Sequence, residues 1–152
     1  QIYSNETKEA LTLVIAGQAL GAEHRFDQIT QKGVIRLGGY ISDGEMRWLF
    51  AHCRAVMLPY REASQSGVLP IAYEFGKPVI ATNIPGLAEC VEEGTTGLLV
   101  NGIPEFARGL GRLSDDALAE KLSLGAKEYY RNHYDWKKNL SDLLEKLFPL
   151  SS

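Results

Sequence analysis

A short polar loop holds the residues best suited to bind a phosphorylated ligand. They are Gln65, Ser66, Gly67 and Val68, and they follow an apolar run that ends at Leu58. A helix is expected to begin near Pro70, because proline at the first helical position has no N–H to leave unpaired. The backbone N–H groups near residues 66–68 would then point outward at the positive end of this helix, where phosphate binds without a dedicated cation. Ser66 adds a hydroxyl, and Gly67 allows a ligand to approach the backbone closely.

One acidic residue of the same expected helix is spaced to bind the sugar of a nucleotide. Glu74 lies about one helical turn beyond Pro70. A carboxylate there can accept hydrogen bonds from both hydroxyls of a ribose while a diphosphate occupies the first turn. An ordinary strand-loop-helix with a Ser-Gly turn and a solvated glutamate accounts for these residues equally well, so the segment by itself leaves both interpretations open.

Short apolar runs alternate with amphipathic stretches and form the scaffold for this segment. Strands are expected at residues 11–17, 34–37, 55–58, 78–82 and 97–100, and helices at 23–32, 43–53, 70–75, 87–92, 103–113, 116–134 and 135–147. Asp43 and Asp115-Asp116 are expected to act as helix caps. The pattern predicts an α/β fold, with a Rossmann-like, doubly wound parallel sheet of at least five strands and C-terminal helices packed back on it. Tyr129, Tyr130, Tyr134 and Trp136 are expected to pack those helices against the core.

Composition limits the classes of function. The 152 residues are 45% hydrophobic and 23% charged, which indicates one globular domain. The net charge of -3 argues against nucleic acid as a general partner. No apolar run approaches the roughly 20 residues of a membrane span, and the first residues show no signal-peptide pattern, so a cytoplasmic protein is expected. Cys53 and Cys90 have no metal spacing and are expected to be buried free thiols.

No metal cofactor is expected. His24, His52 and His133 have no partner at the spacing of metal ligands, and the chain contains no D-x-D triplet of the kind that holds a metal with a nucleotide diphosphate. The acidic Glu89 is expected to orient a loop rather than to bind a ligand.

Three segments of the sequence resemble a known family. Residues 66–81 read SGVLPIAYEFGKPVIA, residues 85–100 read PGLAECVEEGTTGLLV, and residues 130–136 read YRNHYDW. They are similar to the C-terminal, donor-binding domain of retaining glycosyltransferases of the two-Rossmann-domain (GT-B) kind, family four, also called glycosyl transferases group 1. The resemblance extends from about residue 11 to residue 147.

The resemblance implies a nucleotide diphosphate sugar as donor and transfer with retained anomeric configuration. Glu74 matches the second glutamate of the family's E-x7-E motif, which holds the ribose, and Gly67 and Val68 match the backbone around the diphosphate. Gly39 and Tyr40 match a loop against the base, and Gly17 matches a loop near the donor.

The chain departs from the family's pattern at two points. The first glutamate of E-x7-E falls on Ser66, so the donor sugar would meet a neutral partner, or Gln65 or Glu62 would take the role. The family's Arg and Lys that neutralise the departing diphosphate belong to an earlier strand-helix unit, and Arg61 and Lys77 do not match their positions. The sequence therefore identifies no catalytic residue.

Residues 1–152 are accordingly expected to form one nucleotide-sugar-binding domain, a fragment of an enzyme from which the N-terminal acceptor domain and the first strand-helix unit are absent. The acceptor, a glycan or lipid, would be bound by that other domain, and peripheral membrane association of the complete enzyme stays open. Two alternatives remain: a nucleotide-sugar epimerase-type domain, and a non-catalytic flavodoxin-like interaction domain. The second is disfavoured because no acidic cluster follows the first strand at 16–18.

Overall fold

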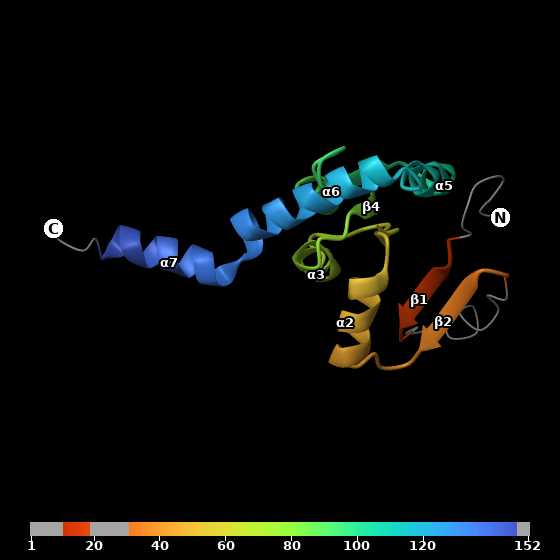
Figure 1. The fold of residues 1–152 in the computed structure, drawn as a ribbon, viewed down its shortest axis with the longest axis horizontal. Helices are drawn as coiled ribbons and strands as arrows, with labels where there is room; N and C mark the ends of the chain where they lie inside the picture. Colours follow the sequence, from red (N-terminus) through yellow and green to blue (C-terminus); the bar gives the residue numbers. More distant parts are fainter. Residues whose placement is uncertain (1–10, 19–30, 149–152) are drawn as a thin grey trace. The chain divides into compact units, whose positions relative to one another are not determined.

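The computed structural model describes residues 11–18 and 31–148, which fall into two compact units on either side of the junction between Leu49 and Phe50 (Figure 1). Most of the helix expected at 23–32 lies outside the described residues, as does His24. Each unit is described by itself.

The first unit contains two parallel strands and the start of a helix. Strand β1 (Leu13–Gly17) pairs with β2 (Val34–Gly38), in a register that runs from Leu13 opposite Val34 to Gly17 opposite Gly38. Both strands lie close to the bounds expected from their apolar residues. Because the strands are parallel, their carboxyl ends, and the loops that follow them, lie at one edge.

Helix α2 (Asp43–His52) begins in this unit, and its cap differs from the expectation. The backbone N–H of Ser42 donates to the Glu45 carboxylate at 2.8 Å, and the N–H of Glu45 donates to the Ser42 hydroxyl at 3.3 Å. This reciprocal pair is a capping box, so Ser42 is the cap and the expectation for Asp43 was wrong. Asp43 instead lies in the first turn, where its charge favours the helix dipole.

The second unit is built on a three-stranded parallel sheet. Strands β3 (Val56–Leu58), β4 (Val79–Thr82) and β5 (Gly97–Val100) are ordered β3-β4-β5. Helix α3 (Val68–Glu74) connects the first two strands, and the short helix α4 (Pro85–Ala88) connects the last two. The parallel α/β class was predicted correctly, but the strands of the described residues form two sheets, of two and three strands, rather than the single sheet expected.

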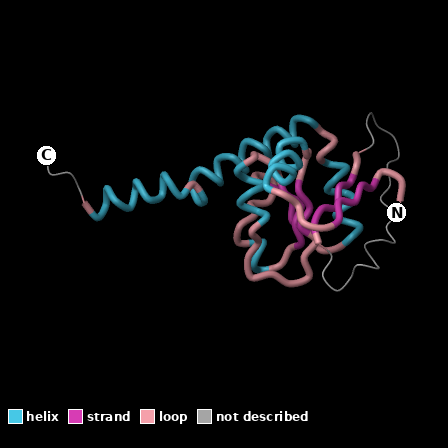
Figure 2. Tube along the Cα trace, turned by 90° about the horizontal axis from the view of Figure 1, so that it is seen from below, coloured by secondary structure: helices cyan, strands magenta, loops and turns pink. Residues whose placement is uncertain are grey.

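Side chains of the central strand are buried on both faces of this sheet. Val79 and Ala81 join a cluster with Tyr73 and Leu87, whereas Ile80 points into a second cluster. That second cluster contains Leu98, Val100, Phe106, Leu113 and Leu122, contributed largely by β5, α5 (Ile103–Arg112) and α6 (Asp116–Tyr129). Alternation of side chains along a strand therefore places a core on each face, which is the double covering expected for this class. Figure 2 traces the described helices in cyan and strands in magenta.

The C-terminal helices follow the expectation only in part. Asp115 caps α6 by accepting from the N–H groups of Ala117 and Leu118, as predicted. The helix expected to continue to residue 134 becomes the π-helix η1 (Tyr130–Tyr134), after which Asp135 caps α7 (Trp136–Leu147). Tyr129, Tyr130 and Tyr134 pack against the first core cluster as expected. Trp136 is 66% exposed, so its expected place in the core was wrong.

Helix α7 is amphipathic, and none of its residues, all of which are described, is buried. Its exposed apolar side chains recur at helical spacing and lie on one face: Trp136, Leu140, Leu143, Leu144 and Leu147, followed by Phe148. Figure 1 shows α7 continuing beyond α6 in the second unit.

Candidate functional site

The predicted phosphate-binding loop leads into helix α3, which begins two residues earlier than expected. Gly67 is the N-cap, with φ -69° and ψ -20°, so Pro70 is the third helical residue and not the first. Proline is accepted there because no N–H of the first turn has a partner within the helix. The earlier start places the backbone N–H of Val68, as well as that of Leu69, in the first turn.

The backbone N–H donors at the start of α3 have no acceptor among the residues that the structure describes. Among residues 11–18 and 31–148, no hydrogen bond is donated by the backbone N–H of Ser66, Gly67, Val68 or Leu69. Gly67 is exposed, and a Cβ built on it would meet no atom within 4 Å. The amides of Gly67 and Val68 are therefore open to a ligand, whereas Leu69 is buried. Gly67 has a negative φ, which other residues also adopt, so the open space beside it is the feature that favours close approach of a ligand.

Ser66 lies within this loop and is half-buried. Its hydroxyl shares a hydrogen bond of 3.3 Å with the hydroxyl of Tyr60, a residue that the sequence analysis did not identify. The only signal for Tyr60 in the sequence is an aromatic residue just after β3, which does not reveal a bond across the loop. Gln65 and Glu62 are both exposed, as is Arg61.

Glu74 is the last residue of α3, and its side chain is exposed. The helix buries Leu69, Ala72 and Tyr73, which leaves Glu74 on the solvent side. It lies about 9 Å along the helix axis from Val68, given a rise of about 1.5 Å per residue. Burial, followed by the negative charges of Glu74 and Asp135, raises the pKa of Tyr130 in η1.

Tyr73 attaches α3 to the loop that precedes β5. Its hydroxyl lies 2.8 Å from the hydroxyl of Thr96 and donates to the carbonyl of Cys90 at 3.1 Å. Thr96 in turn accepts from the N–H of Glu92 at 2.9 Å. Both side chains are fully buried, and burial raises the pKa of Tyr73 well above its usual range. Glu74 therefore lies on a helix whose buried face is held in place by hydrogen bonds.

Lys77 has a structural contact. Its ammonium group donates to the carbonyl of Ala51 at 3.0 Å, which connects the turn after α3 to the end of α2 within the second unit. Lys77, a basic residue near the predicted site, therefore has a backbone partner on α2.

The residues expected near the base lie in the first unit. Gly17 pairs with Gly38 at the carboxyl ends of β1 and β2, and Gly39 follows directly, so Gly17 and Gly39 are brought to one edge. Gly17 has φ 129° and Gly39 has φ 96°, conformations that favour glycine. Tyr40 is 85% exposed. These residues belong to the first unit, and those at 65–68 and 74 belong to the second.

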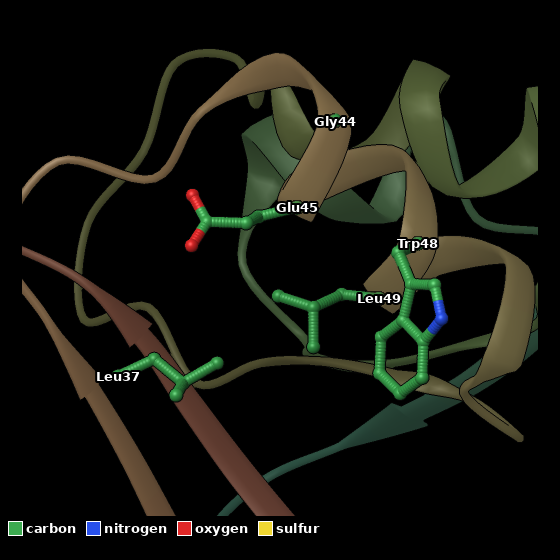
Figure 3. Close-up of a pocket in the computed structure, with 5 residues that line it drawn as sticks. All are labelled: Leu37, Gly44, Glu45, Trp48 and Leu49. Carbon is green, nitrogen blue, oxygen red and sulfur yellow. The ribbon is translucent and has the colours of Figure 1, made fainter.

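A hollow of about 340 Å³ also lies in the first unit, between β2 and the first half of α2 (Figure 3). Leu37, Gly44, Glu45, Trp48 and Leu49 line it, and none of them was predicted to bind a ligand. A hydrogen bond from the Ser42 hydroxyl, together with one from its backbone N–H, lowers the pKa of Glu45. This carboxylate is thus occupied by the capping box, and the hollow does not coincide with the predicted site.

The described residues show neither a metal cluster nor a membrane span. Within them, no group of three or more His, Cys, Asp and Glu residues could hold a metal ion, and no helix has the length and apolar character to cross a bilayer. His133 stacks on Tyr129, with ring centroids 4.1 Å apart. The prediction that donor binding needs no metal stays a prediction.

Comparison with known proteins identifies relatives along the chain. The model of the family described as glycosyl transferases group 1 matches residues 1–116. Glycogen synthase of Mycobacterium tuberculosis is 29% identical over 139 residues, which are 86% of this chain and 33% of that protein. D-inositol 3-phosphate glycosyltransferase of Salinispora arenicola is 29% identical over 148 residues, which are 90% of this chain and 33% of that protein. The chain thus spans about a third of the length of these curated relatives.

Solved structures share the fold. Sucrose-phosphate synthase from Thermosynechococcus elongatus superimposes with a TM-score of 0.70 at 26% identity, over 93% of this chain and 39% of that one. HepE from Anabaena in complex with UDP-glucose superimposes with a TM-score of 0.74 at 24% identity, over 91% of this chain and 41% of that one. The α/β fold class is confirmed.

Proposed function

This chain belongs to the glycosyl transferases group 1 family, and we propose that it is the donor-binding part of a GT-B glycosyltransferase, which binds a nucleotide diphosphate sugar at residues 65–68 and 74. The acceptor, a glycan or lipid, is bound by a part of the enzyme outside these 152 residues. The reaction retains the configuration of the transferred sugar, as the family resemblance implies, in the cytoplasm and without a metal ion.

The open amides at the start of α3 are the observation that carries the proposal. The N–H groups of Gly67 and Val68 have no acceptor among the described residues, and the space beside Gly67 is open. A diphosphate is a suitable acceptor, because a helix start offers both hydrogen-bond donors and a partial positive charge. The exposed carboxylate of Glu74, at the other end of the same helix, supports a ribose contact.

Solved neighbours add support of a coarser kind. The Anabaena protein HepE has been solved with UDP-glucose and with UDP, and its similarity to this chain supports the shared fold. A nucleotide sugar in a protein of this fold makes the same class of ligand a reasonable first choice for testing here.

In the proposed reaction, this chain's residues bind and orient the donor and stabilise the leaving nucleoside diphosphate. The bond between the sugar's anomeric carbon and the diphosphate oxygen breaks, and a bond to the oxygen of an acceptor hydroxyl forms. The proton of that hydroxyl passes to the released nucleoside diphosphate. The amides of Gly67 and Val68 donate to the diphosphate oxygens as negative charge accumulates on them. The isolated chain therefore binds nucleotide weakly and transfers little or no sugar, because the acceptor is bound elsewhere.

A thermal-shift and calorimetric titration with UDP, GDP, ADP and their sugars tests the proposal, with and without EDTA. A ligand at about 100 times its Kd stabilises the native state by about 2.7 kcal/mol, so binding raises Tm. We expect one nucleotide to raise Tm, and to raise it by the same amount with EDTA as without it. Absence of binding by all of them at millimolar concentration would contradict the donor site, and binding lost in EDTA would contradict its independence of metal.

A further inference from the structure

The loop before α3 packs against the first turn of α4 at a position without a side chain. A Cβ built on Gly86 would overlap the carbonyl oxygen of Ala63 and would lie 2.7 Å from the carbonyl carbon and oxygen of Ser64. These are backbone atoms, which cannot rotate away as the end of a flexible side chain can. The loop can therefore lie where it does only because residue 86 has no Cβ.

The same loop is also held from its two ends. The phenol of Tyr60 shares its 3.3 Å hydrogen bond with the hydroxyl of Ser66, and the ring of Tyr60 packs against the first core cluster. At the start of the loop, the Thr82 hydroxyl at the end of β4 donates to the carbonyl of Leu58 at 3.3 Å. Gly86 thus supports the middle of the loop, while Tyr60 connects its end to the core.

We propose that Gly86 and Tyr60 are positioning residues for the donor site: they fix residues 63–66 so that the N–H groups of Gly67 and Val68 face the diphosphate. The inference rests on the proposed function and adds two residues to it. Neither residue needs to touch the ligand. Their effect passes through the backbone that precedes the amides.

A shift of this loop would weaken the contacts with the diphosphate and leave those with the nucleoside in place. Hydrogen bonds weaken steeply when their length and angle change, so a shifted loop loses diphosphate contacts first. Glu74 belongs to α3, which is held to the core by the hydrogen bonds of Tyr73 with Cys90 and Thr96. Glu74 therefore keeps its contact with the ribose when the loop shifts. Loss of positioning therefore lowers affinity for a nucleoside diphosphate more than for the nucleoside alone, whereas general damage to the domain lowers both.

The test compares Gly86→Ala with Gly111→Ala, a matched control in α5 where a Cβ would meet no atom within 4 Å. The ¹⁵N-labelled 152-residue chain is titrated by NMR with UDP, GDP and ADP, each alongside its nucleoside. For the nucleotide that binds, we expect Gly86→Ala to weaken the diphosphate about tenfold or more and the nucleoside less than about twofold. Gly111→Ala should match the unmodified chain for both ligands.

Tyr60→Phe provides a second variant that keeps the ring and removes only the hydroxyl. Tyr60→Phe should lower the affinity for the nucleoside diphosphate by about three- to tenfold without a matching change for the nucleoside. If Gly86→Ala does not fold, this variant alone tests the positioning role. An unchanged ratio of diphosphate to nucleoside affinity in every variant that folds would overturn the inference and leave the proposed function standing. If the unmodified chain binds none of the nucleotides, the proposed function fails, and the positioning role fails with it.

Discussion

The hydroxyl of Tyr73 lies 2.8 Å from the hydroxyl of Thr96, and both side chains are fully buried. The pair connects α3, which carries Glu74, to the loop before β5. Tyr73 also donates to the carbonyl of Cys90, and Thr96 accepts from the N–H of Glu92, so each buried hydroxyl has partners. Buried polar groups cost stability when they lose such partners.

Removal of the Tyr73 hydroxyl should therefore destabilise the domain. Tyr73→Phe leaves the carbonyl of Cys90 and the hydroxyl of Thr96 each with one partner fewer, and we expect the free energy of unfolding to fall by about 1–3 kcal/mol. Urea denaturation measures the change. Tyr40→Phe, at a residue that is 85% exposed, is the control and should leave stability unchanged. Equal stability of both variants would show that the Tyr73 bonds contribute nothing.

Alkaline pH should destabilise the protein through its buried phenols. Burial raises the pKa of Tyr73 and of Tyr134, whereas a tyrosine of the unfolded chain has a pKa of about 10. The unfolded chain therefore loses these protons first, and stability that is fully present below about pH 10 falls as the pH rises above it. Urea midpoints between pH 8 and 11.5 measure the slope. Tyr73→Phe should make the urea midpoint depend less steeply on pH. An unchanged slope would contradict the assignment of the pH dependence to Tyr73.

Substitution of Gly67 should separate ligand binding from folding. Gly67 has a negative φ, and a Cβ there meets no atom within 4 Å, so Gly67→Ala should cost less than about 1 kcal/mol of stability. A diphosphate that contacts this backbone would meet the new methyl group, and nucleotide affinity should fall about tenfold or more. Titration and thermal unfolding of the same sample provide both measurements. Unchanged affinity would place the diphosphate elsewhere.

Neutralisation of Glu74 should weaken nucleotide binding without affecting the fold. Glu74→Gln keeps the size of an exposed side chain but replaces its charged acceptor, and we expect an affinity loss of about 10- to 100-fold for two ribose hydrogen bonds. Glu128→Gln, at an exposed glutamate on α6, is the control. The difference in affinity between Glu74→Gln and the unmodified chain should be smaller for a 2′-deoxynucleotide than for the ribonucleotide. If Glu74→Gln bound the ribonucleotide with unchanged affinity, the ribose contact would be refuted.

Gly125 should be intolerant of any side chain. A Cβ at this position of α6 would overlap the carbonyl oxygen of Thr95 and lie 2.9 Å from its carbonyl carbon, so the helix would have to move away from the loop. Gly125→Ala should destabilise by about 1–3 kcal/mol, although alanine is the better helix former. Gly111→Ala, at a position where a Cβ meets no atom within 4 Å, should leave the free energy of unfolding unchanged or raise it. The two urea midpoints should shift in opposite directions or differ clearly, and coinciding midpoints would exclude the close contact.

Buried β-branched runs made the strands readable from the sequence. Strand β5 was predicted at its observed bounds, and β4 within one residue, because Val79, Ile80 and Ala81 are all buried. A short apolar run rich in β-branched residues is typical of a strand buried on both faces of a covered sheet. The confirmed fold class rests on these strands.

Helix starts and loop contacts were harder to predict, because they depend on local geometry and on distant residues. Pro70 is compatible with any position in the first turn, so it could not fix where α3 begins. Ser42 and Asp43 are both favourable helix caps by residue type, so the sequence alone did not determine which of them caps α2. The contacts of Gly86 with Ala63 and of Tyr60 with Ser66 arise only when the chain folds back on itself, and no local pattern shows them.

The exposed α7 has a consequence for how the domain unfolds. Tyr134 packs on the core, whereas no residue from Trp136 to Leu147 is buried, so the cooperative unit of unfolding ends at about Tyr134. Amide hydrogens of α7 should exchange long before those of β4. Deletion of residues 136–152 should leave the urea midpoint of the sheet in place while removing an apolar stripe that favours self-association in concentrated solution.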